Sequence, residues 1–382
     1  MKIALTADWL ITLAGAEQVL LQLHQLYPDA PIFTTVVKPS AIGSLANADI
    51  RTTRLQRIYP LLRHHQWLLP WMPRAIESHD LGGYDVILSS SHAVGKGIIP
   101  SPNAVHISYC HTPMRYAWEM EDQYLEDFRI PRRLRPSLRR ILAHICLWDL
   151  TTAKRVDVFI ANSSTTQERI ARLYNRESSV IPPPVHERFF RFPLKHNPPS
   201  SDYYLAVGRF VPYKRFDMLI TLANTEQLPL WIAGEGQDYA RLRRMAGPTV
   251  RFLGKVSDDE LPALYANAKT LLFPQHEDAG IVLLEAHACG TPAIAYRAGG
   301  ALDALVEGTT GIFFNEQTTD ALHSAIQTFE GKQWNRQHIR IHAEQYSALR
   351  FRERIEKELH SALGKRGKRL YHGDRETRSR LP

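Results

Sequence analysis

The sequence Pro274-Gln-His-Glu277-Asp-Ala-Gly280-Ile-Val-Leu-Leu-Glu285-Ala-His-Ala-Cys-Gly290-Thr-Pro292 joins a short apolar run to an apolar helical segment. Residues 270–273 predict a strand, and a helix is expected to open at about Gly280. Glu277 would then lie in the loop at the carboxyl edge of a sheet, whereas Glu285 would lie on the helix. The first-turn amides near Gly280, Ile281 and Val282 lack helical acceptors and can hold a phosphate. The alternative interpretation is that Glu277 caps the start of the helix and Glu285 lies on a solvated helix face.

A second motif, Val207-Gly208-Arg209-Phe-Val-Pro-Tyr-Lys214-Arg215-Phe-Asp217, follows another predicted strand at residues 203–207. Arg209 and Lys214 are two cations five residues apart at a strand end. Such a pair can clamp a diphosphate and neutralise it as it departs. An Arg and a Lys at the start of a helix more often face solvent, so the pair alone is a weak signal. Its order and its distance along the sequence relative to the first motif support the interpretation as a diphosphate-binding pair.

Outward from these motifs, short apolar runs alternate with segments of helical period in both halves of the chain. This alternation predicts an α/β fold with two doubly wound, Rossmann-like domains that face a cleft, where a ligand would bind at the strand ends. The prolines at 182–184, 193 and 198–199 mark the boundary and argue against a single (β/α)₈ barrel. We expect a domain at 1–185, a linker at 186–202, a second domain at 203–345, a closing helix at 346–363 and a flexible basic tail at 364–382.

The Glu277 to Pro292 segment resembles the Glu-x7-Glu signature of the family 4 retaining glycosyltransferases (GT4), which have the GT-B fold. The resemblance implies that Glu277 binds hydroxyls of a donor sugar and Glu285 the ribose of its nucleotide, since carboxylates accept charge-assisted hydrogen bonds from hydroxyls. Arg209 and Lys214 match the family's diphosphate-binding pair. The chain departs from the family where Asp278-Ala279 replace Gly-Phe and where Arg215 replaces a glycine.

Further matches extend the resemblance. Val256, in the segment Phe-Leu-Gly-Lys-Val-Ser, is implied to lie beside the nucleobase, and Gly15, in Gly-Ala-Glu, to bring amides to the leaving phosphate. His111 stands where the family places a histidine close to the donor sugar. Its segment, Tyr-Cys-His-Thr-Pro-Met-Arg-Tyr, together with Lys214-Arg215-Phe-Asp217, resembles mannosyltransferases that use GDP-mannose in surface polysaccharide assembly.

Composition and charge narrow the class of protein. The chain has 382 residues, 44% hydrophobic and 23% charged, which fits a soluble globular protein and excludes collagen-like, disordered and disulfide-stapled chains. Three separated cysteines fit a reducing compartment, and no apolar run approaches the roughly 20 residues of a membrane span. Asp8 interrupts the first apolar run too early for a secretory signal. We therefore expect a cytoplasmic protein.

Residues 51–76 contain five arginines and no carboxylate, interleaved with large apolar side chains. A basic stretch that contains tryptophans suits an anionic membrane surface or a lipid-linked substrate. This pattern predicts peripheral attachment to the inner face of the cytoplasmic membrane and a polyprenyl-diphosphate-linked glycan as acceptor. The residues expected to contribute are Arg51, Arg54, Arg57, Trp67 and Trp71. Packing of the apolar residues under the first domain's helices is the alternative, and no nucleic-acid-binding signature accompanies the stretch.

The mechanism implied by the resemblance retains the anomeric configuration, with the acceptor hydroxyl attacking from the face that the phosphate leaves. The acceptor's proton can pass to the departing phosphate oxygen. No Asp-x-Asp occurs in the chain, so we expect no metal and no cofactor. Three alternatives stay open: a non-catalytic module that binds nucleotide sugars, a sugar-nucleotide epimerase of the same two-domain shape, and a nucleic-acid binder.

Overall fold

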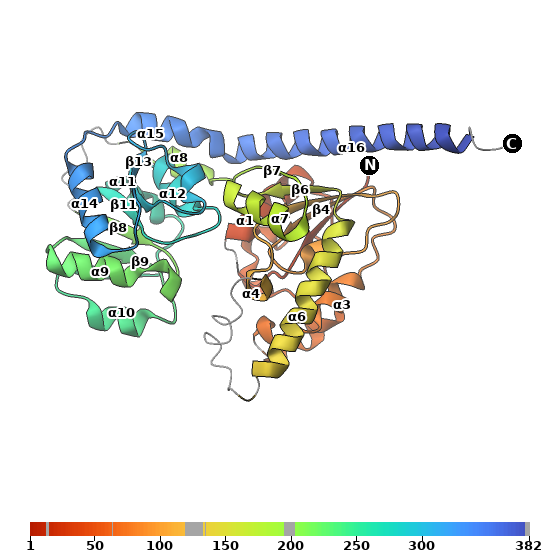
Figure 1. Cartoon of the computed structure of the whole chain (residues 1–382), viewed down its shortest axis with the longest axis horizontal. Coiled ribbons are helices and arrows are strands. Elements are labelled where there is room, and N and C mark those ends of the chain that lie inside the picture. The colour runs from red at the N-terminus through yellow and green to blue at the C-terminus, as the bar shows by residue number, and fades with distance from the viewer. Residues whose placement is uncertain (13–14, 63, 119–132, 134, 195–202, 379–382) are drawn as a thin grey trace. The chain divides into compact units, whose positions relative to one another are not determined.

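The computed structural model describes the chain except for residues 13–14, 63, 119–132, 134, 195–202 and 379–382. Its contacts divide the chain into two compact units (Figure 1). The first unit comprises Met1–Pro182 together with Arg352–Pro382, and the second comprises Pro183–Phe351.

The first unit is built on a seven-stranded parallel sheet with the strand order β3-β2-β1-β4-β5-β6-β7. The two strands that follow β1 in this order, β4 and β5, are buried along their whole length, as is typical of parallel strands that are covered on both faces. The strands are β1 (Ile3–Ala7), β2 (Ile32–Thr34), β3 (Ile50–Thr52), β4 (Val86–Ser91), β5 (Val105–Cys110), β6 (Val158–Ala161) and β7 (Ser178–Val180).

Helices of the first unit connect these strands, and apolar residues on them form its core with the sheet. Ser163 caps one of them, since its hydroxyl accepts a hydrogen bond from the amide of Thr166 at 3.1 Å. The helices are α1 (Gly15–Leu26), α2 (Tyr59–Leu62), α3 (Met72–Glu77), α4 (Arg115–Trp118), α6 (Arg135–Thr152), α7 (Ser164–Tyr174) and, for its larger part, α16 (Ala348–Arg378). Short 3₁₀ turns η4 (His65–Leu68) and η5 (Gly95–Gly97) lie among them.

The second unit has a six-stranded parallel sheet with the order β10-β9-β8-β11-β12-β13. Two apolar clusters cover its two faces, one around Leu271 and Phe273 and the other around Ile232 and Leu272. The strands are β8 (Tyr204–Val207), β9 (Leu230–Ala233), β10 (Val250–Gly254), β11 (Thr270–Phe273), β12 (Ala293–Tyr296) and β13 (Gly311–Phe314). The helices are α8 (Glu187–Arg191), α9 (Phe216–Thr225), α10 (Tyr239–Met245), α11 (Leu261–Asn267), α12 (Ile281–Ala288), α13 (Ala301–Ala304), α14 (Thr319–Glu330) and α15 (Arg336–Ala343).

Both sheets are open and doubly wound, so the predicted α/β class is confirmed and a (β/α)₈ barrel is excluded. In each sheet the strand order reverses at a central pair, β1 and β4 in the first unit and β8 and β11 in the second. Ligands of such folds bind at the carboxyl ends of the strands at this reversal. Among the described residues, no helix combines the length and apolarity that crossing a membrane requires.

Two expectations about the chain's organisation differ from the structure. The segment expected as a linker at 186–202 begins with helix α8, whose Phe189 is 2% exposed because it packs on Tyr265. The closing helix, expected to end at 363, continues through Arg378 as α16, so the part of the tail up to Arg378 is helical. Lysine and arginine are good helix formers, and a basic composition alone does not end a helix.

Candidate functional site

The second unit brings its predicted site residues to the reversal of its sheet. Arg209 and Lys214 follow β8, and Glu277 follows β11, the neighbour of β8 on the other side of the reversal. Because all strands of the sheet are parallel, the loops after β8 and β11 leave the sheet at the same edge. Two motifs more than sixty residues apart in the sequence therefore meet at one place.

Lys214 and Glu277 form an ion pair between the lysine Nζ and the carboxylate Oε1. The lysine side chain is 9% exposed and that of the glutamate 17%, so the pair is largely withdrawn from water. Lys214 reaches Glu277 across Gly208, where a Cβ atom would lie 3.1 Å from Nζ. The absence of a side chain at Gly208 therefore leaves room for the lysine side chain. The sequence motif contains this glycine but does not indicate why it is needed.

The loop that carries Glu277 packs closely against the backbone of Gly299 and Gly300. The amide of Gly300 donates to the carbonyl of Glu277 at 2.8 Å, and a Cβ on Gly299 would lie 2.1 Å from that same oxygen. Any side chain at Gly299, which has a φ of +62°, would displace the loop. These glycines therefore hold the backbone of the loop at Glu277 in place.

Helix α12 starts where the sequence predicted, with Gly280 as its N-cap at a φ of 61° and no side chain capping it. Within the described residues, no backbone acceptor is recorded for the amides of Ile281 and Val282. The positive end of the helix dipole and its first amides thus stay available to an anion. They stand directly after the loop of Glu277.

Glu285, one helical stretch further on, is half-buried and accepts a hydrogen bond from the hydroxyl of Tyr265 at 2.9 Å. Burial raises the pKa of Glu285 to about 7, although the Tyr265 hydrogen bond and the Arg188 charge act in the opposite direction. Arg188 forms an ion pair with Asp258 at 3.0 Å. Tyr265 on α11 was not predicted as a site residue, and nothing in its local sequence marks it.

Val256 lies just beyond β10 and is half-buried. The turns after β8, β9 and β10 are packed together through glycines: the amide of Gly208 donates to Ala233, and that of Gly234 donates to Gly254 at 2.8 Å. A Cβ on Gly234 would lie 1.9 Å from the carbonyl oxygen of Gly208. This packing places Val256 on the same sheet edge as Arg209, which is exposed.

Arg215, one of the residues at which the chain departs from the family pattern, adopts a left-handed backbone with φ 52° and ψ 34°. It ends the 3₁₀ turn η7 (Pro212–Lys214) and begins α9. A glycine would adopt this conformation without steric cost, which explains why the family pattern has a glycine at this position. The backbone path that positions Lys214 is kept despite the substitution.

In the first unit, His111 follows β5 at the carboxyl edge of the sheet, as predicted. Its Nε2 atom lies 2.8 Å from Ser90 Oγ, and its ring lies 5.1 Å from that of Tyr109. Burial, with a smaller effect of His92, lowers the pKa of His111 to about 3, so the ring is neutral. Gly15 is exposed and forms the first residue of α1, where its amide has no acceptor within the helix.

Two family models together cover most of the chain. The model for Glycosyltransferase Family 4 matches residues 13–189, and the model for Glycosyl transferases group 1 matches residues 189–346. The chain belongs to the family 4 glycosyltransferases.

Curated relatives of this glycosyltransferase include the GDP-mannose-dependent alpha-(1-6)-phosphatidylinositol monomannoside mannosyltransferase of Mycolicibacterium smegmatis. It is 30% identical over 237 residues, which cover 51% of this chain and 62% of the relative. The D-inositol 3-phosphate glycosyltransferase 2 of Catenulispora acidiphila is 30% identical over 185 residues, or 41% of this chain and 43% of the relative. The chain thus spans about half the length of the curated relatives it matches.

Solved structures share the fold of this glycosyltransferase. Anabaena HepE in complex with UDP superposes with a TM-score of 0.67 at 18% identity and covers 94% of this chain and 100% of its own. Sucrose-phosphate synthase from Thermosynechococcus elongatus has a TM-score of 0.64 at 19% identity, with 98% of this chain and 100% of its own covered. The fold is therefore GT-B, as the sequence motifs implied.

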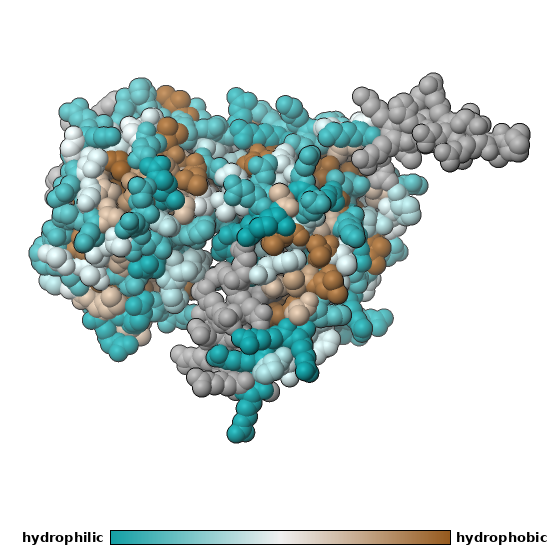
Figure 2. Space-filling view, in the orientation of Figure 1, coloured by the Kyte–Doolittle hydropathy of each residue, from teal (hydrophilic) through white to brown (hydrophobic). Residues whose placement is uncertain are grey.

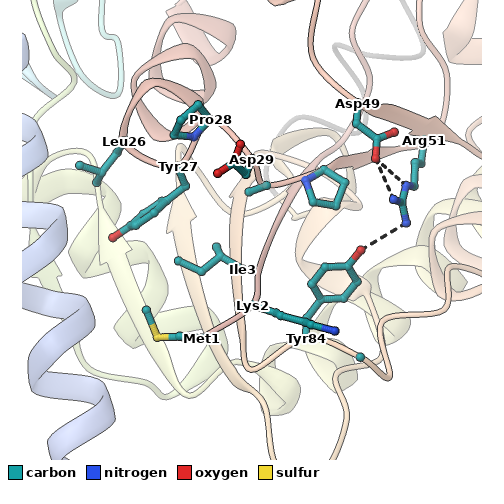
Figure 3. Close-up of a pocket in the computed structure, with 13 residues that line it drawn as sticks. Met1, Lys2, Ile3, Leu26, Tyr27, Pro28, Asp29, Asp49, Arg51 and Tyr84 are labelled. Carbon is teal, nitrogen blue, oxygen red and sulfur yellow. Dashed lines mark hydrogen bonds and ion pairs between the residues drawn. The ribbon is translucent and has the colours of Figure 1, made fainter.

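The basic stretch of this glycosyltransferase at residues 51–76 divides into paired and exposed parts. Arg51 is not the free cation that was expected, because Asp49 accepts from its Nε and Nη2 atoms at 3.0 and 2.7 Å (Figure 3). Its Nη1 atom donates to the Tyr84 hydroxyl at 3.2 Å. Arg51 and Tyr84 line a pocket of about 690 Å³ beside Met1–Ile3, at the amino end of β1. Asp49, the acid that pairs with Arg51, lies just before the stretch 51–76, which itself contains no carboxylate.

The apolar residues of the same stretch also divide. Leu68, Leu69 and Met72 are at most 5% exposed and belong to the core of the first unit, which agrees with the alternative interpretation for these three residues. Trp67 and Trp71, by contrast, are 56% and 58% exposed. Arg54 and Arg57 are exposed too. Figure 2 shows a surface that is largely hydrophilic in this view, with small hydrophobic patches.

No group of three or more His, Cys, Asp or Glu side chains that could hold a metal ion occurs among the residues that the structure describes. The positive charge at the second unit's site comes from Arg209, Lys214 and the start of α12. These groups are of the kind that can bind a diphosphate directly.

Proposed function

We propose that this protein is a retaining glycosyltransferase that moves a hexose from a nucleotide sugar to a glycan or lipid-linked acceptor. The observation that carries the proposal is the Lys214–Glu277 ion pair at the reversal of the second sheet, next to the uncapped start of α12. A cation, a carboxylate and free amides at one strand edge suit a ligand that combines phosphates with hydroxyl groups.

The donor would engage each of these groups separately. Lys214 and Arg209 would hold the diphosphate, together with the amides of Ile281 and Val282. Glu277 would accept hydrogen bonds from sugar hydroxyls, and Glu285, steadied by Tyr265, would accept them from the ribose. Lys214 and Glu277 neutralise each other while the site is empty, so neither buried charge lacks a partner before the donor arrives.

The chemistry follows from these contacts. As the bond between the anomeric carbon and the phosphate oxygen breaks, negative charge grows on the departing diphosphate, where Lys214 and Arg209 stabilise it. The acceptor oxygen attacks the same face of the sugar, which retains the configuration. No carboxylate is assigned here as a nucleophile, in contrast to the paired carboxylates of retaining glycosidases.

For the donor we propose GDP-mannose. The support is the Tyr-Cys-His-Thr-Pro-Met-Arg-Tyr segment around His111 and the relatives in Mycolicibacterium and Mycobacterium tuberculosis that are GDP-mannose-dependent mannosyltransferases. The HepE structure holds UDP, which makes UDP-sugars the necessary comparison. Incubation with GDP-mannose, UDP-glucose, UDP-galactose and dTDP-rhamnose should raise the unfolding temperature most with GDP-mannose. A larger shift with a UDP-sugar would overturn the choice of donor and leave the transferase proposal standing.

For the acceptor we propose a polyprenyl-diphosphate-linked glycan at the inner face of the cytoplasmic membrane, where surface polysaccharides are assembled. The support is the exposed set Arg54, Arg57, Trp67 and Trp71. Arginines attract anionic head groups and tryptophans favour the interface.

The test of the proposed activity is acceptor-dependent release of nucleoside diphosphate. A sugar-nucleotide epimerase releases no nucleotide in turnover. A non-catalytic binding module does not transfer the sugar, and it does not hydrolyse the donor even slowly. Lys214→Ala should reduce transfer, whereas Lys269→Ala should not, because Lys269 pairs with Glu330 at the amino end of β11. Equal loss of transfer in both variants would show a general effect of removing an ion pair. It would contradict the assignment of Lys214 to the donor site.

A further inference from the structure

Tyr265, on α11, is held rigidly in the core of the second unit. It is 0% exposed and belongs to the apolar cluster around Leu271 and Phe273. Its ring meets that of Phe189 edge-on, with 5.9 Å between the ring centroids. Its carbonyl oxygen accepts a hydrogen bond from Thr291 Oγ1 at 2.6 Å. Because both the ring and the backbone are fixed, the phenol oxygen has a fixed position.

The hydroxyl of Tyr265 is committed to Glu285. It donates to the Oε2 atom of that carboxylate at 2.9 Å, across 20 positions of sequence. A buried hydroxyl without an acceptor would cost free energy, so this hydrogen bond is strongly favoured. Within the described part of the chain, no partner is recorded for the other oxygen of Glu285, and the residue is half-buried. One carboxylate oxygen is thus held and the other is available to a ligand.

Tyr265 remains a donor over the whole pH range in which Glu285 titrates. Burial, and then the charge of Glu285, raises the pKa of Tyr265 well above its usual range, so the phenol keeps its proton. A lysine in this place would form an ion pair and compete with a ligand for the carboxylate. A neutral hydroxyl instead supplies one hydrogen bond and leaves the negative charge to attract ligand hydroxyls.

The other titratable groups around Glu285 have opposing effects. Arg188, on α8, favours the ionised carboxylate, whereas Asp258, which pairs with Arg188 at 3.0 Å, disfavours it. On the same helix, burial raises the pKa of Cys289, so its thiol is uncharged. Burial of Glu285 itself favours the neutral form. Among the groups that face this carboxyl, Tyr265 therefore contributes most to keeping it ionised.

We propose that Tyr265 is a positioning residue for the ribose of the donor, because its hydroxyl fixes one oxygen of Glu285 and leaves the other to accept from the ribose. The inference rests on the proposed function, in which Glu285 binds that ribose. Tyr265 touches no part of the donor in this account and acts through Glu285. Without the hydroxyl, the carboxylate loses both a fixed orientation and a hydrogen bond that favours its charge.

Tyr265→Phe is the variant to test, because it keeps the ring and its packing and removes one oxygen. The ligand is the nucleotide sugar that raises the unfolding temperature most among the four named above, and calorimetric titration from pH 6 to pH 9 measures its affinity. The midpoint of the pH dependence should move upward by about one unit, so that the affinity at pH 7 falls about fivefold. At pH 9 it should return to within about threefold of the wild type. Damage to the fold would lower the affinity equally at every pH.

Two further variants isolate the contact. Tyr203→Phe is the matched control, since Tyr203 is 8% exposed and its hydroxyl donates to the carbonyl of Leu264 at 2.8 Å in the same unit. It should leave the midpoint where the wild type has it. In Glu285→Gln the pH dependence should be flat, and adding Tyr265→Phe to it should change the affinity by less than about threefold, because the group through which Tyr265 acts is gone.

The ribose is tested directly by its hydroxyls. At pH 7 the wild type should bind the nucleoside diphosphate of this donor more tightly than the 2′,3′-dideoxy form, whose phosphates titrate alike. Tyr265→Phe should reduce that preference about fivefold, whereas Tyr203→Phe should retain it.

The outcomes separate the two proposals. If the wild type binds none of the four nucleotide sugars, the proposed function fails and the inference fails with it. If the wild type binds one of them and transfers its sugar, but the pH profile of Tyr265→Phe matches the wild type or is lowered by one factor at every pH, the inference fails alone. An unchanged preference for ribose over dideoxyribose in Tyr265→Phe would likewise overturn it.

Discussion

The ammonium of Lys214 and the carboxylate of Glu277 form an ion pair across the reversal of the second sheet, although the two residues belong to different loops. Each of the two charges has the other as its recorded ion-pair partner. A nucleotide sugar would exchange this pair for two better-matched contacts, the lysine with phosphate and the glutamate with sugar hydroxyls. The pair would therefore link the affinity for the diphosphate to the position of the sugar.

Lys214→Ala should weaken the binding of nucleotide sugar and its turnover, because one charge of the diphosphate loses its partner. Glu277→Ala should mainly depress turnover and leave the binding of the free nucleoside diphosphate almost intact. Calorimetric titration of both variants, beside a transfer assay, checks the two roles. If Glu277→Ala abolished the binding of free nucleotide but spared transfer, the assignment of the two residues would be wrong.

If Glu285 binds the donor's ribose, the binding of donor should be sensitive to pH. Its pKa of about 7 means that the carboxyl is partly protonated at neutral pH. Ribose hydroxyls donate to the charged form, so the affinity should rise as the pH rises through 7, by about tenfold between pH 6 and pH 8. The ligand should be a nucleotide sugar, whose phosphates do not titrate in this range. Glu285→Gln should bind with a flat pH dependence, and an unchanged slope in that variant would refute the role.

Arg215→Gly should stabilise the second unit by about 1 kcal/mol, since a left-handed backbone costs a non-glycine residue that order of energy. The loss of its 3.4 Å contact with Asp217 removes little, because both side chains are about one-third exposed. Urea unfolding measures the change. Arg243→Gly, inside α10, is the control and should destabilise by a similar amount, because glycine is a poor helix former.

Transfer should survive excess EDTA to within a small factor. Arg209, Lys214 and the start of α12 already supply positive charge where the diphosphate would bind, and the chain has no Asp-x-Asp motif. Initial rates with and without EDTA are sufficient. Complete loss of activity that magnesium or manganese restores would contradict this electrostatic role.

Wild-type protein should co-sediment with anionic vesicles and not with neutral ones. Arg54→Glu combined with Arg57→Glu should abolish this, because about 1 kcal/mol of attraction per arginine becomes repulsion. Arg51→Gln is an informative control, since Arg51 is engaged with Asp49 and its loss should have a smaller effect. Unchanged sedimentation of the double variant would exclude the membrane surface and leave the transferase assignment intact.

Much of the fold could be read from local patterns. The strand at 270–273 was predicted with the bounds that the structure has, and the next helix was predicted to open at about Gly280, which is its N-cap. Both predictions succeed because a buried strand and an apolar helix have distinct lengths and periods. β3 and β7 were missed: each has only three residues and a polar composition. Such short edge strands form because a neighbouring strand offers hydrogen bonds, which the sequence does not display.

The sequence by itself determined the parallel α/β architecture, the family and the positions of the charged residues around Lys214, Glu277 and Glu285, because these depend on residue type and spacing. Only the tertiary structure decided which groups meet. It pairs Lys214 with Glu277, bonds Tyr265 to Glu285, neutralises Arg51 with Asp49, and joins Asp8 to His92 across 84 positions of sequence. Contacts of that kind arise when parallel strands bring distant loops to one edge, and local sequence carries no record of the partner.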